Sequence, residues 1–342
     1  MTRFIHRGYH SSPVYYLCIL LFVVVRGIKL YPYILLVLVI IFYAGNILTG
    51  KALNDLPPIT IAYFRLLVAF LFLLPVGYRS TGKAKSVFLQ HYKPLLVMTV
   101  TGVAFFNTFI YASLQFTTAT NVSVLETLIP VLTVILSSLI LKEHVNALQI
   151  IGIVLSLWGA LWVVLNGNLF HLTRLEWNLG DGIMIGAIIC WSVYSLVVKQ
   201  VMHLFPLLGT ILVMTGLSLV ILFPMLIVEW LIYGVPSLWT RPNILGLLYL
   251  GVFPSLIALL FYNIAVERLG ASKASVFLNL LPVVTMTGAY FWLGEQVTLV
   301  QVAGAILVIL GVVLTTKPLS LKRKSLYNTE KMRNGKGKHL YK

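Results

Sequence analysis

Charged residues and cysteine are both scarce in this sequence. Only 10% of its 342 residues are charged and only two are cysteines, whereas roughly a quarter of a soluble domain is charged. Cys18 and Cys190 lie in apolar stretches without the paired spacing of a metal or redox site, so they are interpreted as packing residues. The scarcity of charge excludes a water-soluble globular protein, because a soluble core cannot hide the remaining apolar surface.

Acidic residues are the scarcest charged type. The chain has 9 Asp and Glu against 25 Lys and Arg, which gives a formal net charge of +16. Half of this charge, +8, comes from the tail after Thr316, where nine basic residues accompany Glu330. Most other basic residues lie in short loops between apolar runs. This distribution indicates membrane topology signals and not a nucleic-acid-binding surface.

Long apolar runs account for most of the chain. The mean hydropathy is +0.96, and a helix needs about twenty apolar residues to cross a bilayer. Ten runs near that length predict an all-α integral membrane protein with ten transmembrane helices. The runs begin at about Tyr31, Ile59, Pro94, Thr120, Leu148, Leu179, Phe205, Ile244, Lys273 and Thr298. The basic and apolar extension 1–30 contains a twelve-residue apolar stretch that is too short to span, so an interfacial segment is expected there.

The basic residues also predict the orientation. With the amino terminus inside, 21 of the 25 Lys and Arg lie on the inner side and three on the outer side, and Arg65 falls within a span. Positive residues concentrate on the cytoplasmic side of membrane proteins. We therefore expect a multi-pass protein of the cell membrane with both termini in the cytoplasm.

The two halves of the chain repeat one another. Residues at a constant offset of 152 match, as do two residues at an offset of 148. The pairs are Pro130 and Pro282, Glu143 and Glu295, Gly152 and Gly304, Gly159 and Gly311, Lys51 and Lys199, and Pro58 and Pro206. Five spans per repeat, an odd number, predict two inverted five-helix repeats, at 31–166 and 179–317, followed by a basic cytoplasmic tail, 318–342.

Several short motifs carry a resemblance to a known family. They are Asn46 with Lys51, the run Tyr63-Phe64-Arg65, the segment from Tyr111 to Ala119, and Glu143 and Glu295. In these motifs and their duplication the chain resembles the drug/metabolite transporter superfamily, EamA type. The resemblance implies secondary transport of small metabolites, commonly amino acids or related compounds, without ATP hydrolysis. The position that matches Arg65 in the second repeat is Val213, so an anion site would be asymmetric.

The expected function is export of a small organic metabolite by alternating access. An uptake carrier and a broad-specificity drug efflux protein are alternatives, and a channel or a nontransporting membrane scaffold represents a different class. No catalytic residue, metal site or cofactor is predicted. The run Gly77–Lys83 has phosphate-loop spacing, but Ala84 replaces the required Ser or Thr. The expected partners are a small-molecule substrate and the lipid bilayer. Coupling to protons is left open. A monomer is sufficient, and a dimer is the alternative.

Arg65 and Glu126 are the first candidates for a substrate site, because ionisable groups within a membrane are costly. Counting from the outer face places both side chains roughly 9 to 11 Å deep. One interpretation is a static ion pair between the two spans. The other is a binding site, in which Arg65 meets a substrate carboxylate and Glu126 accepts a coupled proton or a substrate amine.

Two prolines predict helix kinks close to the membrane depth of Arg65 and Glu126. Pro130 and Pro282 leave the carbonyls of Glu126 and Leu278 without their helical hydrogen bonds. Free carbonyls beside Glu126 and Asn279 would suit an ammonium group. A purely mechanical hinge is the competing interpretation.

Other polar and aromatic side chains recur at helical spacing. The candidates are Asn46, Asn107, Tyr111, Trp191, Tyr194, Ser255 and Tyr262. Since lipid offers no hydrogen bonds, these side chains should face partner helices or a common site for an amphipathic metabolite. Both interpretations stay open for each residue. Glu143 and Glu295 are expected to cap helices, and the paired glycines to allow close helix contact.

Overall fold

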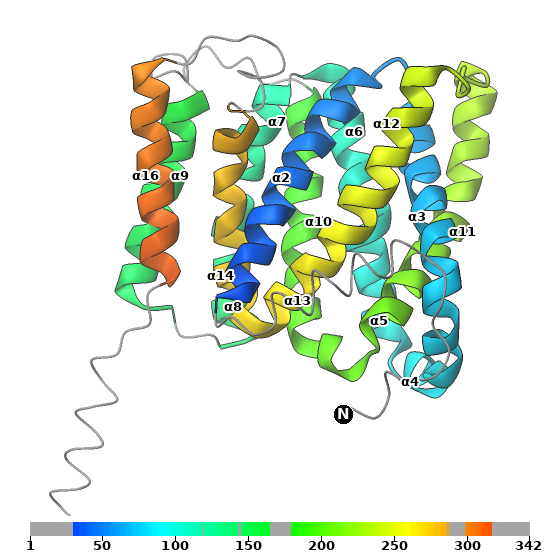
Figure 1. The fold of residues 1–342 in the computed structure, drawn as a ribbon, viewed down its shortest axis with the longest axis horizontal. Coiled ribbons are helices and arrows are strands. Elements are labelled where there is room, and N and C mark those ends of the chain that lie inside the picture. The colour runs from blue at the N-terminus through cyan, green and yellow to red at the C-terminus, as the bar shows by residue number, and fades with distance from the viewer. Residues whose placement is uncertain are drawn as a thin grey trace, which may run out of the picture.

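The computed structural model describes residues 30–117, 119–142, 145–164, 179–285, 287 and 298–316. These residues form helices and no strand (Figure 1). Each predicted start lies within three residues of the start of a helix. The extension 1–29, the tail, Glu143 and Glu295 lie outside the described residues, so the expectations for them stay predictions.

The helices of the first half are α2 (Tyr31–Ala52), α3 (Pro58–Lys83), α4 (Lys85–Gln90), α5 (Tyr92–Met98), η2 (Thr99–Phe105), α6 (Phe106–Phe116), α7 (Ala119–Glu126), α8 (Ile129–Ile140) and α9 (Ala147–Val164). Those of the second half are α10 (Leu179–Val201), η4 (Met202–Leu204), α11 (Leu207–Tyr233), α12 (Arg241–Val252), η5 (Phe253–Ala258), α13 (Leu259–Leu269), α14 (Ala271–Val276), η6 (Phe277–Leu280) and α16 (Leu299–Thr316). The run Gly77–Lys83 belongs to α3, so it forms a helix and not a phosphate loop.

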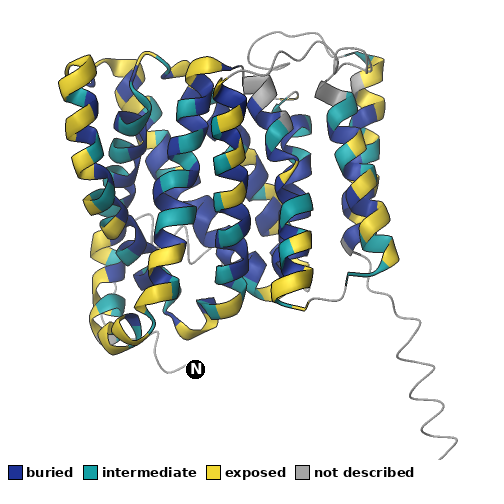
Figure 2. Ribbon diagram, turned by 180° about the vertical axis from the view of Figure 1, so that it is seen from behind, coloured by how far each residue is buried: buried dark blue, intermediate teal, exposed yellow. Residues whose placement is uncertain are grey.

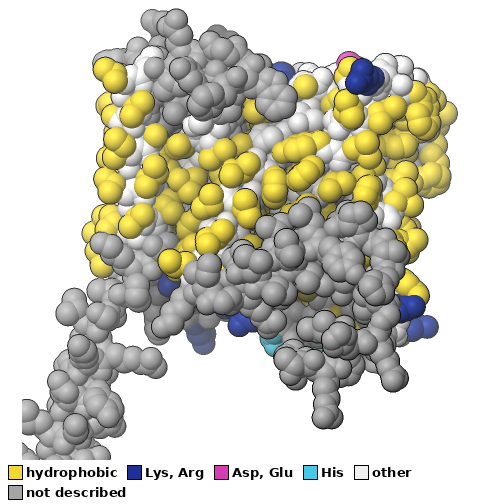
Figure 3. Space-filling view, viewed as in Figure 1, with side chains coloured by type: hydrophobic (Ala, Val, Ile, Leu, Met, Phe, Trp, Pro, Cys, Tyr) yellow, Lys and Arg dark blue, Asp and Glu magenta, His cyan; other side chains and the backbone are white. Residues whose placement is uncertain are grey.

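The helices have the length and composition of membrane spans. Six continuous helical segments are long and apolar enough to cross a bilayer, and shorter apolar helices accompany them. Buried residues line the inside of the bundle, while exposed ones face outward (Figure 2). On the face in Figure 3, hydrophobic side chains cover the described surface between the two ends, and Lys and Arg lie at the ends. This arrangement confirms a multi-pass membrane protein, because the apolar surface matches lipid and the ends match water.

Equivalent helices of the two halves pack antiparallel at the edges of the bundle. At one edge, α9 lies against α16, with Gly152 beside Gly311 and Gly159 beside Gly304 (Figure 1). These two contacts exchange when each residue is replaced by its match at an offset of 152, as a two-fold axis requires. At the other edge, α3 lies against α11. The matching helices therefore run in opposite directions, as the odd number of spans per repeat predicts.

Irregular turns interrupt the central helices at matching places. The π-helical turn η2 lies between α5 and α6, and the π-helical turn η5 lies between α12 and α13. Before Pro130 the helix breaks at Thr127 and Leu128, and before Pro282 it tightens into the 3₁₀ turn η6. The predicted distortions before both prolines are therefore confirmed.

Candidate functional site

Arg65 lies at the centre of a hydrogen-bonded cluster of side chains from four helices. Its side chain is 2% exposed, and its Nε donates to Ser255 Oγ at 2.6 Å. Its Nη1 donates to Asn46 Oδ1 at 2.9 Å and to Asn107 Oδ1 at 2.8 Å, and it also contacts the Tyr111 hydroxyl. That hydroxyl donates to Asn46 Oδ1 at 2.8 Å. The structure thus brings together five of the predicted site residues, and we call them the Arg65 cluster.

The local backbone explains how these side chains meet. A Cβ on Gly50 would lie 2.7 Å from Tyr111 Cε1, so the glycine lets the Tyr111 ring approach α2. In η5 the Ser255 hydroxyl donates to the Leu250 carbonyl five residues earlier, at 2.6 Å. This bond leaves the oxygen of Ser255 free to accept from Arg65. π-helical turns occur often at functional sites, where they reposition side chains.

The Arg65 cluster contains a positive charge without a negative partner. All of the Arg65 hydrogen-bond acceptors are neutral, and within the described part of the chain none accepts from its Nη2. Among the described residues Arg65 forms no ion pair with Glu126, so the static pair is not formed in this structure. A buried guanidinium whose acceptors are all neutral is suited to bind a carboxylate, since charge-assisted hydrogen bonds are the stronger ones.

Glu126 is the last residue of α7 and precedes the break in the helix. Its side chain is 4% exposed, and no hydrogen bond joins it to the described residues. Its helix, α7, packs against α2 and α6, which carry Asn46, Asn107 and Tyr111 of the Arg65 cluster. Glu126 therefore supplies a second buried ionisable group near the same region.

An aromatic cluster surrounds Trp191 beside these groups. The Trp191 ring centroid lies 5.7 Å from that of Tyr43, 4.3 Å from Phe106, 5.2 Å from Tyr194 and 4.8 Å from Tyr262. Phe106 directly precedes Asn107, so the aromatic cluster is next to the Arg65 cluster in the fold. Three of the predicted site residues, Trp191, Tyr194 and Tyr262, meet here.

Polar atoms accompany the aromatic cluster. The Tyr194 hydroxyl donates to Asn263 Oδ1 at 2.5 Å, and the hydroxyls of Ser195 and Tyr262 lie 2.7 Å apart. The indole Nε1 of Trp191 and the amide Nδ2 of Asn263 have no hydrogen-bond partner among the described residues. Unsatisfied buried donors are costly, so a bound acceptor would stabilise them.

Asn279 lies apart from both clusters. Its Nδ2 donates to Ser156 Oγ of α9 at 2.8 Å, and its side chain is fully buried. None of its hydrogen bonds to the described residues reaches the Arg65 cluster. Asn279 therefore joins η6 to α9 through its Nδ2, while its Oδ1 has no hydrogen-bond partner among the described residues. Asn263 and Phe106 are the residues that the sequence analysis missed, although Asn263 directly follows the predicted Tyr262.

Antiparallel equivalent repeats in an apolar helical bundle, with buried polar clusters where they meet, define a class of protein: membrane transporters built from internal repeats. The model of the EamA-like transporter family matches this chain twice, at residues 30–165 and 178–317. The chain belongs to the EamA-like transporter family, which confirms the resemblance to the drug/metabolite transporter superfamily.

Similar proteins agree with this membership. The uncharacterized transporter YyaM of Bacillus subtilis is 31% identical over 296 residues, which cover 83% of this chain and 94% of that protein. A probable terminal-alkyne amino-acid exporter of Streptantibioticus cattleyicolor is 27% identical over 202 residues, 58% of this chain and 64% of its own. One solved crystal structure aligns with a TM-score of 0.68 at 16% identity, covering 83% of this chain and 95% of that one, and it shares the fold.

Proposed function

We propose that this protein is a secondary transporter that exports a small organic metabolite carrying a carboxylate, by alternating access. The observation that carries this proposal is Arg65, a buried cation whose acceptors are all neutral. A substrate carboxylate replaces these oxygens with a charge-assisted, two-pronged contact to the guanidinium. The inverted repeats supply the two-state framework that such transport needs.

The aromatic cluster and Glu126 indicate which groups the substrate carries besides its carboxylate. The rings around Trp191 suit an apolar or unsaturated group, and Glu126 suits a substrate amine or a coupled proton. Together with Arg65, these groups favour an amino acid or a related compound. The Streptantibioticus relative, a probable terminal-alkyne amino-acid exporter, supports the same class. Pro130 and Pro282 serve in this scheme as hinges between the inward-open and outward-open states.

The proposed topology has ten spans in two repeats, 31–166 and 179–317, in the cell membrane. The six long helical segments and the shorter apolar ones supply these spans. Both termini, with the extension 1–30 and the tail 318–342, lie in the cytoplasm. One chain contains the whole site, so a monomer is sufficient for transport.

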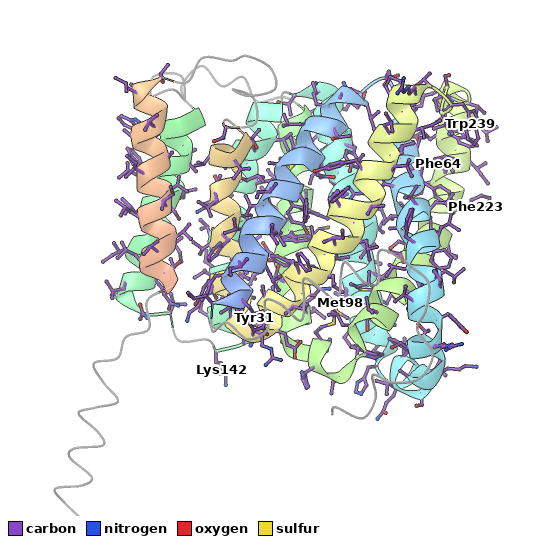
Figure 4. All side chains as sticks on the ribbon, viewed as in Figure 1. Tyr31, Phe64, Met98, Lys142, Phe223 and Trp239 are labelled. Carbon is purple, nitrogen blue, oxygen red and sulfur yellow. The ribbon has the colours of Figure 1, made fainter. Side chains whose placement is uncertain are left out.

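Labelling of two single cysteines tests this topology. Lys142 and Trp239 are both exposed, and they lie at opposite ends of the bundle (Figure 4). In intact cells, Trp239→Cys is expected to react with a membrane-impermeant maleimide, and Lys142→Cys only after the cells are opened, because the inner side holds most basic residues. Native Cys18 and Cys190 are replaced with serine as background. Reaction of Lys142→Cys in intact cells would contradict the orientation.

A ligand screen followed by transport assays tests the proposed function. Purified protein is heated with amino acids, amines, nucleosides and organic acids, and a bound ligand raises its melting temperature. Each hit is then offered to proteoliposomes. A carrier saturates and shows counterflow, whereas a channel shows neither. If none of the carboxylates raises the melting temperature or is transported, the proposal is wrong.

Substitution of Glu126 separates proton coupling from substrate binding. Glu126→Gln keeps the shape and hydrogen bonding of the side chain but cannot take up a proton in this pH range. If Glu126 carries the coupled proton, we expect the rate of transport driven by a pH gradient to fall at least about tenfold in this variant. Substrate exchange should continue, because exchange needs no net proton movement. Gradient-driven transport at the wild-type rate in proteoliposomes with matched protein levels would contradict proton coupling at Glu126.

A further inference from the structure

Two short helical hairpins end at opposite ends of the bundle. We define the first tip as residues 106–117 and 119–126, which include α6 and α7, and the second tip as residues 259–276, formed by α13 and α14. In Figure 1 the labels of α6 and α7 lie in the upper half of the bundle, and those of α13 and α14 lie in the lower half. The two tips therefore belong to different ends of the bundle.

Each tip is separated from the rest of its helices by irregular turns. The first tip lies between η2 and the break at Thr127 and Leu128, and the second lies between η5 and η6. Helices bend where the regular hydrogen-bond pattern is interrupted. Each tip can therefore tilt as a unit without bending a regular helix.

Lys51 binds the first tip at its end. It lies in the last turn of α2, and its Nζ donates to the Leu114 carbonyl at 2.9 Å and to the Thr117 carbonyl at 3.3 Å. These carbonyls belong to the carboxyl end of α6, where the helix dipole is negative. The ammonium group therefore joins α2 to the first tip through charge-assisted hydrogen bonds.

Lys199 makes the equivalent contact at the other end of the bundle. It follows Lys51 at the repeat offset of 148 and lies in the last turn of α10. Its Nζ donates to the Glu267 carbonyl, in the last turn of α13, at 2.9 Å. The inverted repeats thus place the same lysine contact once on each tip.

We propose that Lys51 and Lys199 are a pair of latches, each of which holds one tip closed at one face of the membrane. This inference rests on the proposed transporter function. Release of Lys51 opens the first tip toward the outside, and release of Lys199 opens the second tip toward the cytoplasm. Both contacts are formed in this structure, so both tips are closed in it, and alternating access then opens one latch at a time while the other stays closed.

The Arg65 cluster connects the substrate to the first latch. Two of the Arg65 acceptors, Asn107 and Tyr111, belong to the first tip. A substrate carboxylate that takes Arg65 away from these oxygens loosens the tip at the depth of the site. Lys51 then carries the charged contact at the end of the same tip. Substrate binding therefore favours opening of the first tip and release to the outside.

Two buried reporter cysteines measure the state of each tip. Leu114→Cys in the first tip and Ala265→Cys in the second replace fully buried side chains one helical turn after Tyr111 and Tyr262. Each is introduced into protein whose Cys18 and Cys190 are replaced with serine. Labelling rates are measured with an impermeant maleimide, in cells for the first reporter and in inside-out vesicles for the second.

The test combines each reporter with lysine variants that keep the length of the side chain. Lys51→Met is expected to speed labelling of Leu114→Cys about tenfold and to slow labelling of Ala265→Cys, since the two open states compete. Lys199→Met is expected to do the reverse. Lys142→Met, which removes an exposed lysine that has no hydrogen bond to the described residues, is the control and should change neither rate.

A latch differs from a structural cap in its effect on the two reporters: a latch variant speeds labelling of one reporter cysteine and slows labelling of the other. A cap would lower the melting temperature and change both labelling rates in the same direction, or neither, and either outcome would overturn the proposal. The assay needs no substrate. If the two labelling rates change in opposite directions but none of the screened compounds is transported, the latches are supported and the proposed function is rejected. If a compound is transported but both labelling rates change in the same direction, the proposed function is supported and the latches are rejected.

Discussion

Replacing Arg65 with leucine is expected to lower the initial transport rate by at least about 100-fold while the protein stays folded. The lost contact with a substrate carboxylate corresponds to about 3 kcal/mol, within the range for truncating one partner of a buried charge pair. Folding should survive because the variant removes a buried charge that has no carboxylate partner in the described part of the chain. Asn46, Asn107 and Tyr111 already share hydrogen bonds without Arg65. Transport is measured in proteoliposomes, and folding by the melting temperature in detergent.

Two further variants define what the Arg65 result means. Arg79→Leu removes an exposed arginine from the same helix and should leave transport unchanged. Arg65→Lys keeps the charge but loses the planar fork, so we expect its rate to lie between those of the wild type and Arg65→Leu. A wild-type rate in Arg65→Leu would reject the carboxylate site. A large fall in its melting temperature would instead show that the Arg65 cluster has a structural role.

The fold was largely predictable from the apolar runs. A span must match the thickness of the hydrocarbon layer, and the runs expected to begin at about Tyr31 and about Leu179 coincide with α2 and α10. Proline chemistry also predicted the distortions before Pro130 and Pro282. The π-helical turns η2 and η5 were not predicted, because no residue type specifies a π turn as proline specifies a kink.

The site was predictable only in part. Helical spacing selected Asn46, Asn107, Tyr111 and Ser255 as polar residues that turn away from lipid, and all four contact Arg65 in the structure. Depth alone could not decide whether Arg65 meets Glu126. Depth says nothing of the direction in which a side chain leaves its helix, and the guanidinium turns to neutral oxygens.

Side-chain direction also explains why the structure places Asn279 and Asn263 differently from the prediction. Asn279 was selected by its position before Pro282, yet it faces Ser156 of α9. Asn263 was passed over in favour of its neighbour Tyr262, whereas both contact α10 through side-chain hydrogen bonds. Adjacent residues on a helix point about 100° apart, and a π turn just before them shifts both directions.

Adding a methyl group at the contact between α9 and α16 is expected to destabilise the protein most. In Gly311→Ala the new Cβ would lie 2.5 Å from the Ser156 amide nitrogen and 2.6 Å from the Gly152 carbonyl oxygen. Both are backbone atoms, which no change of rotamer can move, so the two helices must separate. Overpacking of this kind costs about 3 kcal/mol, which corresponds to a fall of roughly 5 to 10 °C in melting temperature for a chain of this size.

The repeat supplies a second site with the same expectation, and α10 supplies a control. In Gly159→Ala the Cβ would lie 2.7 Å from the Val308 amide nitrogen and 2.8 Å from the Gly304 carbonyl oxygen, so a similar fall is expected. In Gly182→Ala the Cβ meets no atom within 4 Å, and the melting temperature should hold or rise slightly, since alanine favours helix. Melting is followed by fluorescence-detected size-exclusion chromatography after heating. If Gly311→Ala and Gly159→Ala have the same melting temperature as Gly182→Ala, the two helices are not held by close backbone contact. The antiparallel pairing of α9 with α16 would then need another cause.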